Sequence, residues 1–222
     1  MDTKVRSQVK VGDEYFDNPD GDTHDASGLH KKLSLYKVLK NSYEPQDRLK
    51  RWGYNMDKSL SNDNQQVYYN PKEKKLLYSV AGTHNLSDVG TDLFLAGGAL
   101  KSTNRYKEAD EVLKKSKAKY NPQQTVVVGH SLGSSIGQGI ASKGRGDKFY
   151  GLDAGYTIGQ KTRSGNGKFH NYRTAGDAVS LLGSGAKHMK TLANPNFQTG
   201  VKPLDAYNAH NVSNIKKENI FI

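Results

Sequence analysis

Residues 129–133 read Gly-His-Ser-Leu-Gly, a G-x-S-x-G segment that directly follows a β-branched run at 125–128. A serine at the tip of a sharp strand-to-helix turn needs neighbours without side chains, because strand and helix approach each other closely there. The pattern therefore predicts that Ser131 is a nucleophile on such a turn, with Gly129 and Gly133 making room around it. The corresponding chemistry is acyl transfer to water through a serine ester. The alternative is an ordinary Gly-Ser turn.

A serine at neutral pH is a poor nucleophile, so the chain should also supply a base and an acid that orients the base. When the nucleophile sits on this kind of turn, the order along the chain is serine, acid, histidine. Asp177 follows a strand-like run at 168–173 and is the favoured acid. Asp153 follows a strand-like run at 149–152 and is the rival acid. For each aspartate the alternative is a carboxylate that caps a turn.

His210, in a polar stretch late in the chain, is the favoured base and closes the order that begins at Ser131. His170 lies upstream of Asp177 and breaks that order, and His188 lies in a basic stretch typical of the surface. His130, inside the turn, is interpreted as structural, with its side chain leaving on the side opposite to the serine.

An acyl-transfer site also needs two donors for the developing oxyanion. The first is the backbone N–H of Leu132, the residue after the nucleophile. The second is expected from a loop after an earlier strand, and Gly82-Thr83 fits because the glycine lets the backbone approach closely. Thr83 would offer both an N–H and a hydroxyl.

The elements that position these residues alternate between strand and helix patterns. Runs at 65–69 and 75–80 flank an Asn-Pro turn and predict a hairpin, while 25–39 and 93–119 are predicted to be largely helical. Alternation of helices with buried strands predicts an α/β fold, with a mainly parallel central sheet and helices on both faces.

The chain has 222 residues, enough for one domain with a sizeable core. Residues 1–24 are polar and lack periodicity, and they are expected to be an N-terminal arm to a single domain at 25–222. The first fifteen residues lack the apolar region of a signal peptide, and no apolar run approaches the roughly 18 residues that cross a bilayer. The sequence fixes neither compartment nor oligomeric state.

The net charge is +11, from 33 Lys and Arg against 22 Asp and Glu. This balance favours anionic partners, and an anionic membrane surface is one candidate. No specific nucleic-acid site is predicted, because no nucleic-acid-binding motif accompanies the charge. The absence of cysteine excludes disulfides and thiolate metal sites, and neither a metal nor a cofactor is expected.

Several segments together, spread over about residues 65–215, resemble the lipase class 3 family, the fungal-type triacylglycerol lipases. The matching segments are Val80-Ala81-Gly82-Thr83, the Asp-Val…Asp-Leu stretch at 87–93, Val-Val-Val-Gly-His-Ser-Leu-Gly at 126–133, the acid segment at 173–179, and the late His210. The chain departs from the family pattern at Ser134 in place of a second glycine, at Val89 in place of tryptophan, and at Ser180 in place of proline.

The resemblance implies an α/β-hydrolase fold and hydrolysis of carboxylic esters without a cofactor. It implies that Thr83 is an oxyanion residue and that Asp92 holds the Thr83 hydroxyl in place; alternatively, Asp92 is a carboxylate favoured by a helix N-terminus. The leading hypothesis is a serine ester hydrolase that acts on lipid or lipid-like esters through Ser131, Asp177 and His210. The alternatives are a phospholipase or small-ester esterase, and a non-catalytic binding or structural protein on the same fold.

Overall fold

The computed structural model describes residues 8–11, 14–17, 32–43, 47–83, 100–155, 167–177, 179–181, 189–193, 209–216, 218 and 220–222. The chain divides into two compact units, Met1–Lys31 and Lys32–Ile222. In the first unit, β1 (Gln8–Val11) pairs antiparallel with β2 (Glu14–Asp17). The boundary predicted after residue 24 lies outside the described residues.

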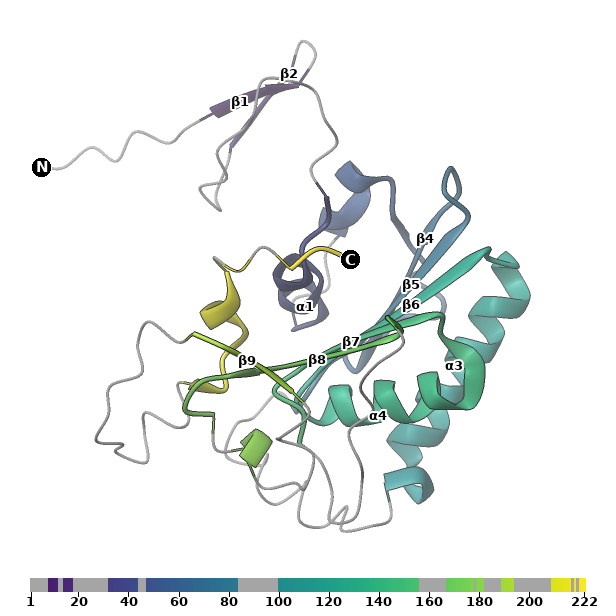
Figure 1. Ribbon diagram of the computed structural model, residues 1–222. Helices are drawn as coiled ribbons and strands as arrows, with labels where there is room; N and C mark the ends of the chain where they lie inside the picture. Colours follow the sequence, from purple (N-terminus) through teal and green to yellow (C-terminus); the bar gives the residue numbers. More distant parts are fainter. Residues whose placement is uncertain are drawn as a thin grey trace, which may run out of the picture. The chain divides into compact units, whose positions relative to one another are not determined.

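The second unit is built on a sheet that has seven strands in the described part of the chain, and their spatial order follows the chain. The strands are β3 (Asn55–Met56), β4 (Gln65–Asn70), β5 (Lys75–Val80), β6 (Gln124–His130), β7 (Lys148–Leu152), β8 (Phe169–Thr174) and β9 (Lys190–Leu192). β3, β4 and β5 pair antiparallel, whereas each neighbouring pair from β5 to β9 is parallel. The predicted β4–β5 hairpin and the mainly parallel sheet are confirmed (Figure 1).

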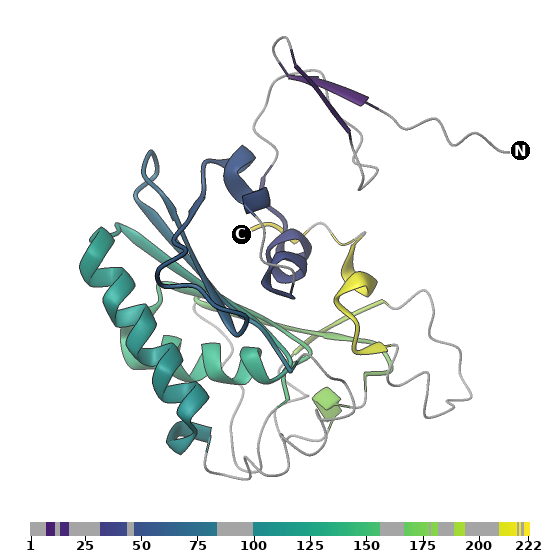
Figure 2. The ribbon, with the colours of Figure 1, turned by 180° about the vertical axis from the view of Figure 1, so that it is seen from behind.

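Helices cover both faces of this sheet, as predicted. The α-helices are α1 (Leu35–Tyr43), α3 (Asn104–Tyr120) and α4 (Leu132–Ile140); the shorter helices are η1 (Asp47–Trp52), η2 (Leu100–Ser102), the π-helical η3 (Ala141–Arg145), η4 (Val179–Leu181) and η6 (Val212–Ile215). α1 lies on one face, and α3 and α4 lie on the other (Figures 1 and 2). Of the helix predicted at 25–39, residues 25–31 lie outside the described part, residues 32–34 are not helical because Ser34 instead forms a β-bridge with Phe221, and the helix begins at Leu35 and runs on to Tyr43. Of the stretch predicted helical at 93–119, residues 93–99 lie outside the described part.

The two faces are apolar because the inner strands carry large apolar residues at successive positions, which point to opposite sides. On β6, Val126 and Val128 belong to the cluster around α1, while Val127 belongs to the cluster around α3 and α4. On β5, Leu77 faces α1 and Tyr78 faces α3. All five side chains are fully buried, so each contributes on the order of 2 kcal/mol of hydrophobic stabilisation.

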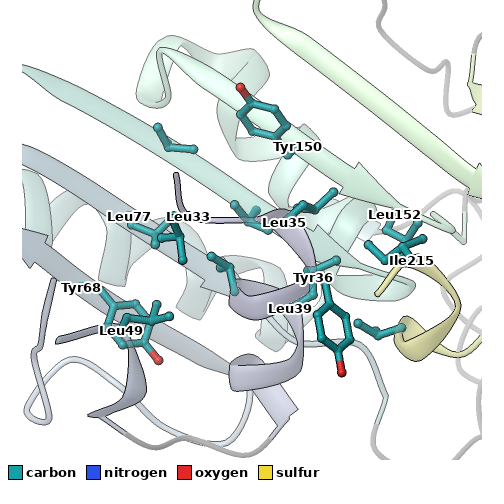
Figure 3. Packing of buried hydrophobic residues seen from close by; sticks show 14 of the residues in the cluster. Leu33, Leu35, Tyr36, Leu39, Leu49, Tyr68, Leu77, Tyr150, Leu152 and Ile215 are labelled. Carbon is teal, nitrogen blue, oxygen red and sulfur yellow. The ribbon is translucent and has the colours of Figure 1, made fainter. Parts of the chain in front are cut away.

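The α1 side of the core joins segments that are distant in the sequence. Leu35 and Leu39 of α1 lie over the sheet against Leu77 and Leu152, and Ile215 of η6 closes the end of the cluster (Figure 3). The backbone extends this contact, because Leu35 N–H donates to the carbonyl of Ile220 at 2.8 Å. The C-terminal segment that carries His210 is thereby anchored near α1.

Parallel strands β5, β6, β7 and β8 all end at the same edge of the sheet. The residues that follow them are 81–83, 131, 153 and 175–177, which include the predicted nucleophile Ser131, both candidate acids and Thr83. In open α/β sheets, ligands bind outside the carboxyl ends of the strands, so this edge is where a functional site is expected. The architecture is that of an α/β-hydrolase fold. In the described part of the chain, the helices are all too short or too polar to cross a bilayer.

Candidate active site

Ser131 lies at the junction of β6 and α4, in the strand–turn–helix setting that the sequence predicted. Its backbone has φ 55° and ψ −128°, a conformation that costs a residue with a Cβ roughly 1–3 kcal/mol. The turn is tied to the neighbouring strand, because Ser131 N–H donates to Leu152 O at 3.0 Å and Ser131 O accepts from Gly155 N–H at 3.3 Å. The fold therefore holds a strained serine where parallel strands end.

The glycines on either side of the serine are required by close backbone contacts. A Cβ on Gly133 would collide with the carbonyl oxygens of Val80 and Ala81, and one on Gly129 would lie 2.7 Å from the Cα of Ser134. Real Cβ atoms essentially never come this close to backbone. Helix α4 consequently packs directly against the ends of β5 and β6, as the supporting role predicted for both glycines requires.

The imidazole of His210 is held by Asp177. His210 Nδ1 lies 2.8 Å from Asp177 Oδ1, and both side chains are almost completely buried, at 1% and 0% exposed. Asp177 also accepts hydrogen bonds from the backbone N–H groups of Val179 (3.1 Å) and Ser180 (2.9 Å), which fix its orientation. With a proton on Nδ1, the neutral ring presents the bare Nε2 as its basic atom.

Burial is the largest single influence on the pKa of each partner, but the hydrogen bonds and charges around each group together outweigh it. Burial alone would raise the pKa of Asp177, but the hydrogen bond and charge of His210 and the contacts of Ser180 bring it below its usual range. Burial alone would lower the pKa of His210, but Asp177, with a smaller contribution from Asp153, raises it above its usual range. The pair is thus biased towards an ionised carboxylate beside a readily protonated imidazole.

Asp153, the rival acid, is engaged elsewhere. Its carboxylate accepts from Thr174 N–H at 2.5 Å and from the Thr174 hydroxyl at 2.8 Å. Burial, and after it the nearby charge of Asp177, raises the pKa of Asp153 to about 7. Of the two aspartates, only Asp177 is hydrogen-bonded to His210.

Two buried polar atoms at this edge have no hydrogen-bond partner among the described residues, the hydroxyl of Ser131 and Nε2 of His210. Ser131 and His210 are each only 1% exposed. A buried polar group without a partner typically costs 1–3 kcal/mol. Ser131 Oγ and His210 Nε2 are two of twelve such side-chain atoms among the described residues, and they are set apart by the Asp177 carboxylate that holds the other ring nitrogen of His210. The predicted nucleophile and the predicted base are therefore not hydrogen-bonded to each other, nor is either atom bonded to another described residue.

The loop after β5 lies against the serine. A Cβ on Gly82 would be 2.9 Å from the Cβ of Ser131. Arg105 of α3 donates to the carbonyls of Ala81 (2.5 Å) and Gly82 (3.0 Å), which fixes the peptide planes of this loop. The next residue, Thr83, is half-buried and follows the strand paired in parallel with β6.

Leu132 is the first residue of α4, so its N–H has no acceptor within the helix. The helix N-terminus adds a partial positive charge at the same point. Leu132 itself is 8% exposed. The N–H of Leu132 thus lies at the start of the helix, directly after the serine, as expected of an oxyanion donor.

His130, Asp153 and His210 place candidate metal-ligand atoms within 4.8 Å of one another. Most of these atoms are already engaged within the protein: both carboxylate oxygens of Asp153 bind Thr174, and the two ring nitrogens of His130 contact Tyr43 and the carbonyl of His210. The arrangement is therefore a hydrogen-bonded network rather than an open set of ligands.

Among the other predicted residues, Asp92 and His188 lie outside the described part of the chain, and His170 bonds to Gly167 O at 3.0 Å. Sequence reasoning did not identify Arg105 or Tyr43, which contact the loop after β5 from α3 and α1. A lone arginine early in one amphipathic helix and a tyrosine ending another carry no signal in a single sequence.

No protein-family model matches the chain, and no curated protein matches it. Among solved structures, it is similar to Rhizomucor miehei lipase in its propeptide complex, with 16% identity, a TM-score of 0.46, and coverage of 67% of this chain and 61% of that one. A lipase from Rhizopus microsporus var. chinensis has 15% identity, a TM-score of 0.44, and coverage of 71% and 70%.

A triacylglycerol lipase from Penicillium expansum has 15% identity, a TM-score of 0.41, and coverage of 79% and 82%. The chain thus spans less than two thirds of the Rhizomucor lipase. All three are lipases, the class that the sequence motifs resemble. Each TM-score lies below 0.5, so these likenesses do not decide the activity. The activity is argued from the geometry of the site instead.

Proposed function

We propose that this protein is a serine hydrolase of carboxylic esters, in which Ser131 is the nucleophile, His210 the base and Asp177 the acid that orients the base. The observation that carries the proposal is the pair of buried atoms without partners, Ser131 Oγ and His210 Nε2, at an edge where Asp177 fixes the other ring nitrogen. Because Asp177 holds the proton on Nδ1, the unpartnered Nε2 of His210 is left as the basic atom that a serine nucleophile needs.

In the first half of the reaction, the Ser131 hydroxyl attacks the ester carbonyl and its proton passes to Nε2 of His210. The imidazolium that forms is stabilised by the carboxylate of Asp177, which stays ionised. Negative charge develops on the former carbonyl oxygen, and the N–H groups of Leu132 and Thr83 are the proposed donors to it. Collapse of this intermediate expels the alcohol, which takes the proton from His210, and leaves an acyl-serine.

In the second half, a water molecule takes the place of the alcohol. His210 Nε2 removes a proton from the water as the oxygen attacks the acyl carbon, and the same two N–H groups hold the oxyanion again. Cleavage of the ester bond returns the proton to Ser131 Oγ and releases the carboxylic acid. The cycle needs no cofactor.

The proposed substrates are lipid or lipid-like esters. This substrate class comes from the motif resemblance and the similarity to lipases rather than from the contacts of the site. A panel of short soluble esters, a triglyceride and a phospholipid, assayed with the wild type and with Ser131→Ala, tests both the activity and the class. Ser131→Ala should lower turnover by several orders of magnitude on every substrate that the wild type cleaves. Hydrolysis that persists in Ser131→Ala would contradict the proposed nucleophile.

A further inference from the structure

The histidine inside the G-x-S-x-G segment, His130, makes contacts that link distant parts of the proposed site. His130 is 4% exposed, its ring centroid lies 4.8 Å from that of His210, and its Nε2 lies 3.0 Å from the backbone oxygen of His210. These residues are 80 positions apart in sequence. His130 thus connects the strand that ends at the nucleophile to the segment that carries the base.

The partners of His130 define its tautomer. A carbonyl oxygen can only accept, so His130 Nε2 carries the proton that it donates to His210 O. Burial, and after it the charge of His210, lowers the pKa of His130 to about 3, so the ring is neutral at working pH. In a neutral ring the other nitrogen has no proton, and Nδ1 must therefore accept.

The donor to Nδ1 is the hydroxyl of Tyr43, which lies 2.5 Å away. Burial raises the pKa of Tyr43 well above its usual range, so the hydroxyl keeps its proton and can donate it. The same oxygen accepts the N–H of Gly82 at 2.9 Å. Tyr43, the last residue of α1, thus reaches the loop after β5.

Together these contacts form one continuous chain of hydrogen bonds that all point the same way. Gly82 N–H donates to Tyr43, the Tyr43 hydroxyl donates to His130, and His130 donates to the carbonyl of His210. Hydrogen bonds arranged head to tail in a buried site polarise and strengthen one another. One end of the chain is the backbone of the proposed base, and the other lies next to the proposed oxyanion donor Thr83.

We propose that Tyr43 and His130 are positioning residues that fix the base segment and the oxyanion loop relative to each other across Ser131. The inference rests on the proposed function, because it concerns how well the parts of that site are aligned. By engaging the N–H of Gly82, Tyr43 leaves Thr83 as the residue of this loop that donates to the oxyanion. By holding the His210 backbone, His130 sets where Nε2 lies.

A purely structural role predicts a different outcome from a positioning role. If the chain only stabilises the fold, breaking it lowers the free energy of unfolding but leaves kcat unchanged in the protein that remains folded. If it aligns the site, breaking it lowers kcat, because misplacement of about 1 Å can cost on the order of 10²-fold in rate. KM should change little, since neither residue is proposed to contact the substrate.

The test compares Tyr43→Phe with Tyr78→Phe in the full-length protein. Both changes delete a buried hydroxyl that makes two hydrogen bonds, and the Tyr78 hydroxyl bonds Gln65 and Ala109 on the α3 side of the sheet, away from the site. Tyr43→Phe should lower kcat about 10- to 100-fold with KM within about 3-fold of wild type. Tyr78→Phe should lower the unfolding midpoint without lowering kcat.

Two substitutions of His130 extend the test. His130→Leu should lower kcat at least as far as Tyr43→Phe, whereas His130→Gln, whose amide can still donate to His210 O, should recover part of the loss. In the double variant Tyr43→Phe/His130→Gln, the fold-loss of kcat should be smaller than the product of the two single fold-losses, because both residues belong to one chain of hydrogen bonds.

Equal kcat values in Tyr43→Phe, Tyr78→Phe and the wild type would overturn the inference while leaving the proposed function intact. A loss of kcat in Tyr78→Phe as large as that in Tyr43→Phe would also overturn it, because the effect would then follow from general destabilisation. A wild-type protein that hydrolyses no ester contradicts the proposed function itself, and the inference falls with it.

Discussion

Asp153 accepts two hydrogen bonds from Thr174, one from its N–H at 2.5 Å and one from its hydroxyl at 2.8 Å. Thr174 is the last residue of β8, three positions before Asp177. Asp153 thus fastens the end of the strand from which Asp177 reaches His210. This contact assigns different tasks to two buried aspartates that the sequence left as rivals.

The first prediction separates these two tasks. Asp177→Asn should lower kcat/KM about 10³- to 10⁴-fold, because an amide cannot stabilise the imidazolium and favours the wrong tautomer of His210. Asp153→Asn should lower kcat/KM less than about 10-fold at pH 8–9, because the asparagine oxygen can still accept a hydrogen bond from Thr174. Steady-state kinetics on a soluble ester measure both. The opposite order of losses would transfer the role of acid to Asp153.

The second prediction concerns the acidic limb of the pH–rate profile. A base must be neutral to act, and the pKa of His210 is raised, so kcat/KM should fall as the pH drops through a midpoint above 6.5, the ordinary value for histidine. Asp153 contributes to that rise and itself titrates with a pKa of about 7, so the limb reports the two groups together. Asp153→Asn should therefore move the midpoint to lower pH.

The control for this shift is Asp57→Asn. Asp57 is also buried, but its carboxylate binds Lys119 at 2.7 Å and Tyr120 at 2.8 Å, near the end of α3. Its removal should leave the midpoint of the limb in place. A midpoint that moves equally in both variants, or upwards in Asp153→Asn, would contradict the electrostatic account of His210.

The third prediction concerns the packing that holds the serine turn. Gly133→Ala should lower the free energy of unfolding by roughly 3 kcal/mol and remove most activity, because the new methyl group meets the fixed carbonyl oxygens of Val80 and Ala81. Gly137→Ala, in the same helix, meets only side-chain carbons of Phe149 and Val127, at 3.0 and 3.2 Å. The higher helix propensity of alanine offsets that contact, so the free energy of unfolding of Gly137→Ala should stay within about 1 kcal/mol of wild type. Urea unfolding measures both, and equal losses would contradict the account.

Much of the fold could be predicted from local patterns. The β4–β5 hairpin follows from two strand-like runs around an Asn-Pro turn, and the turn at Ser131 follows from glycines between a β-branched strand and a helix of small residues. The order of serine, acid and histidine then leads to His210 and to two candidate acids, of which the favoured Asp177 is in contact with His210 in the structure. These features are local, or are constrained by the order of the chain.

What could not be predicted depends on side chains that meet across different elements. Tyr43 and His130 are 87 positions apart, and nothing in either segment indicates that they touch. His130 was expected to be structural, but its hydrogen bond to the backbone of His210, 80 positions away, could not be predicted. The choice between Asp153 and Asp177 likewise required their partners, because both follow parallel strands that end at one edge.

The fourth prediction concerns the net charge of +11. If the basic surface recruits the protein to anionic lipid, hydrolysis of esters in mixed vesicles should rise with the anionic fraction and fall with salt, since exposed charges are screened beyond about 8–10 Å at physiological ionic strength. A soluble short ester should show neither trend. An equal salt response for the two substrates would mean that the charge serves another purpose.

The most direct test of the central claim is the reaction of the protein with a fluorophosphonate, followed by intact-mass analysis and mapping of the modified residue. The account predicts that the wild type gains one phosphonyl group, on Ser131, that Ser131→Ala gains none, and that Asp177→Asn reacts far more slowly, because only a serine with a correctly oriented base is activated. A wild-type protein that stays unmodified under conditions that label a known serine hydrolase, or that is modified equally in Ser131→Ala, would contradict it.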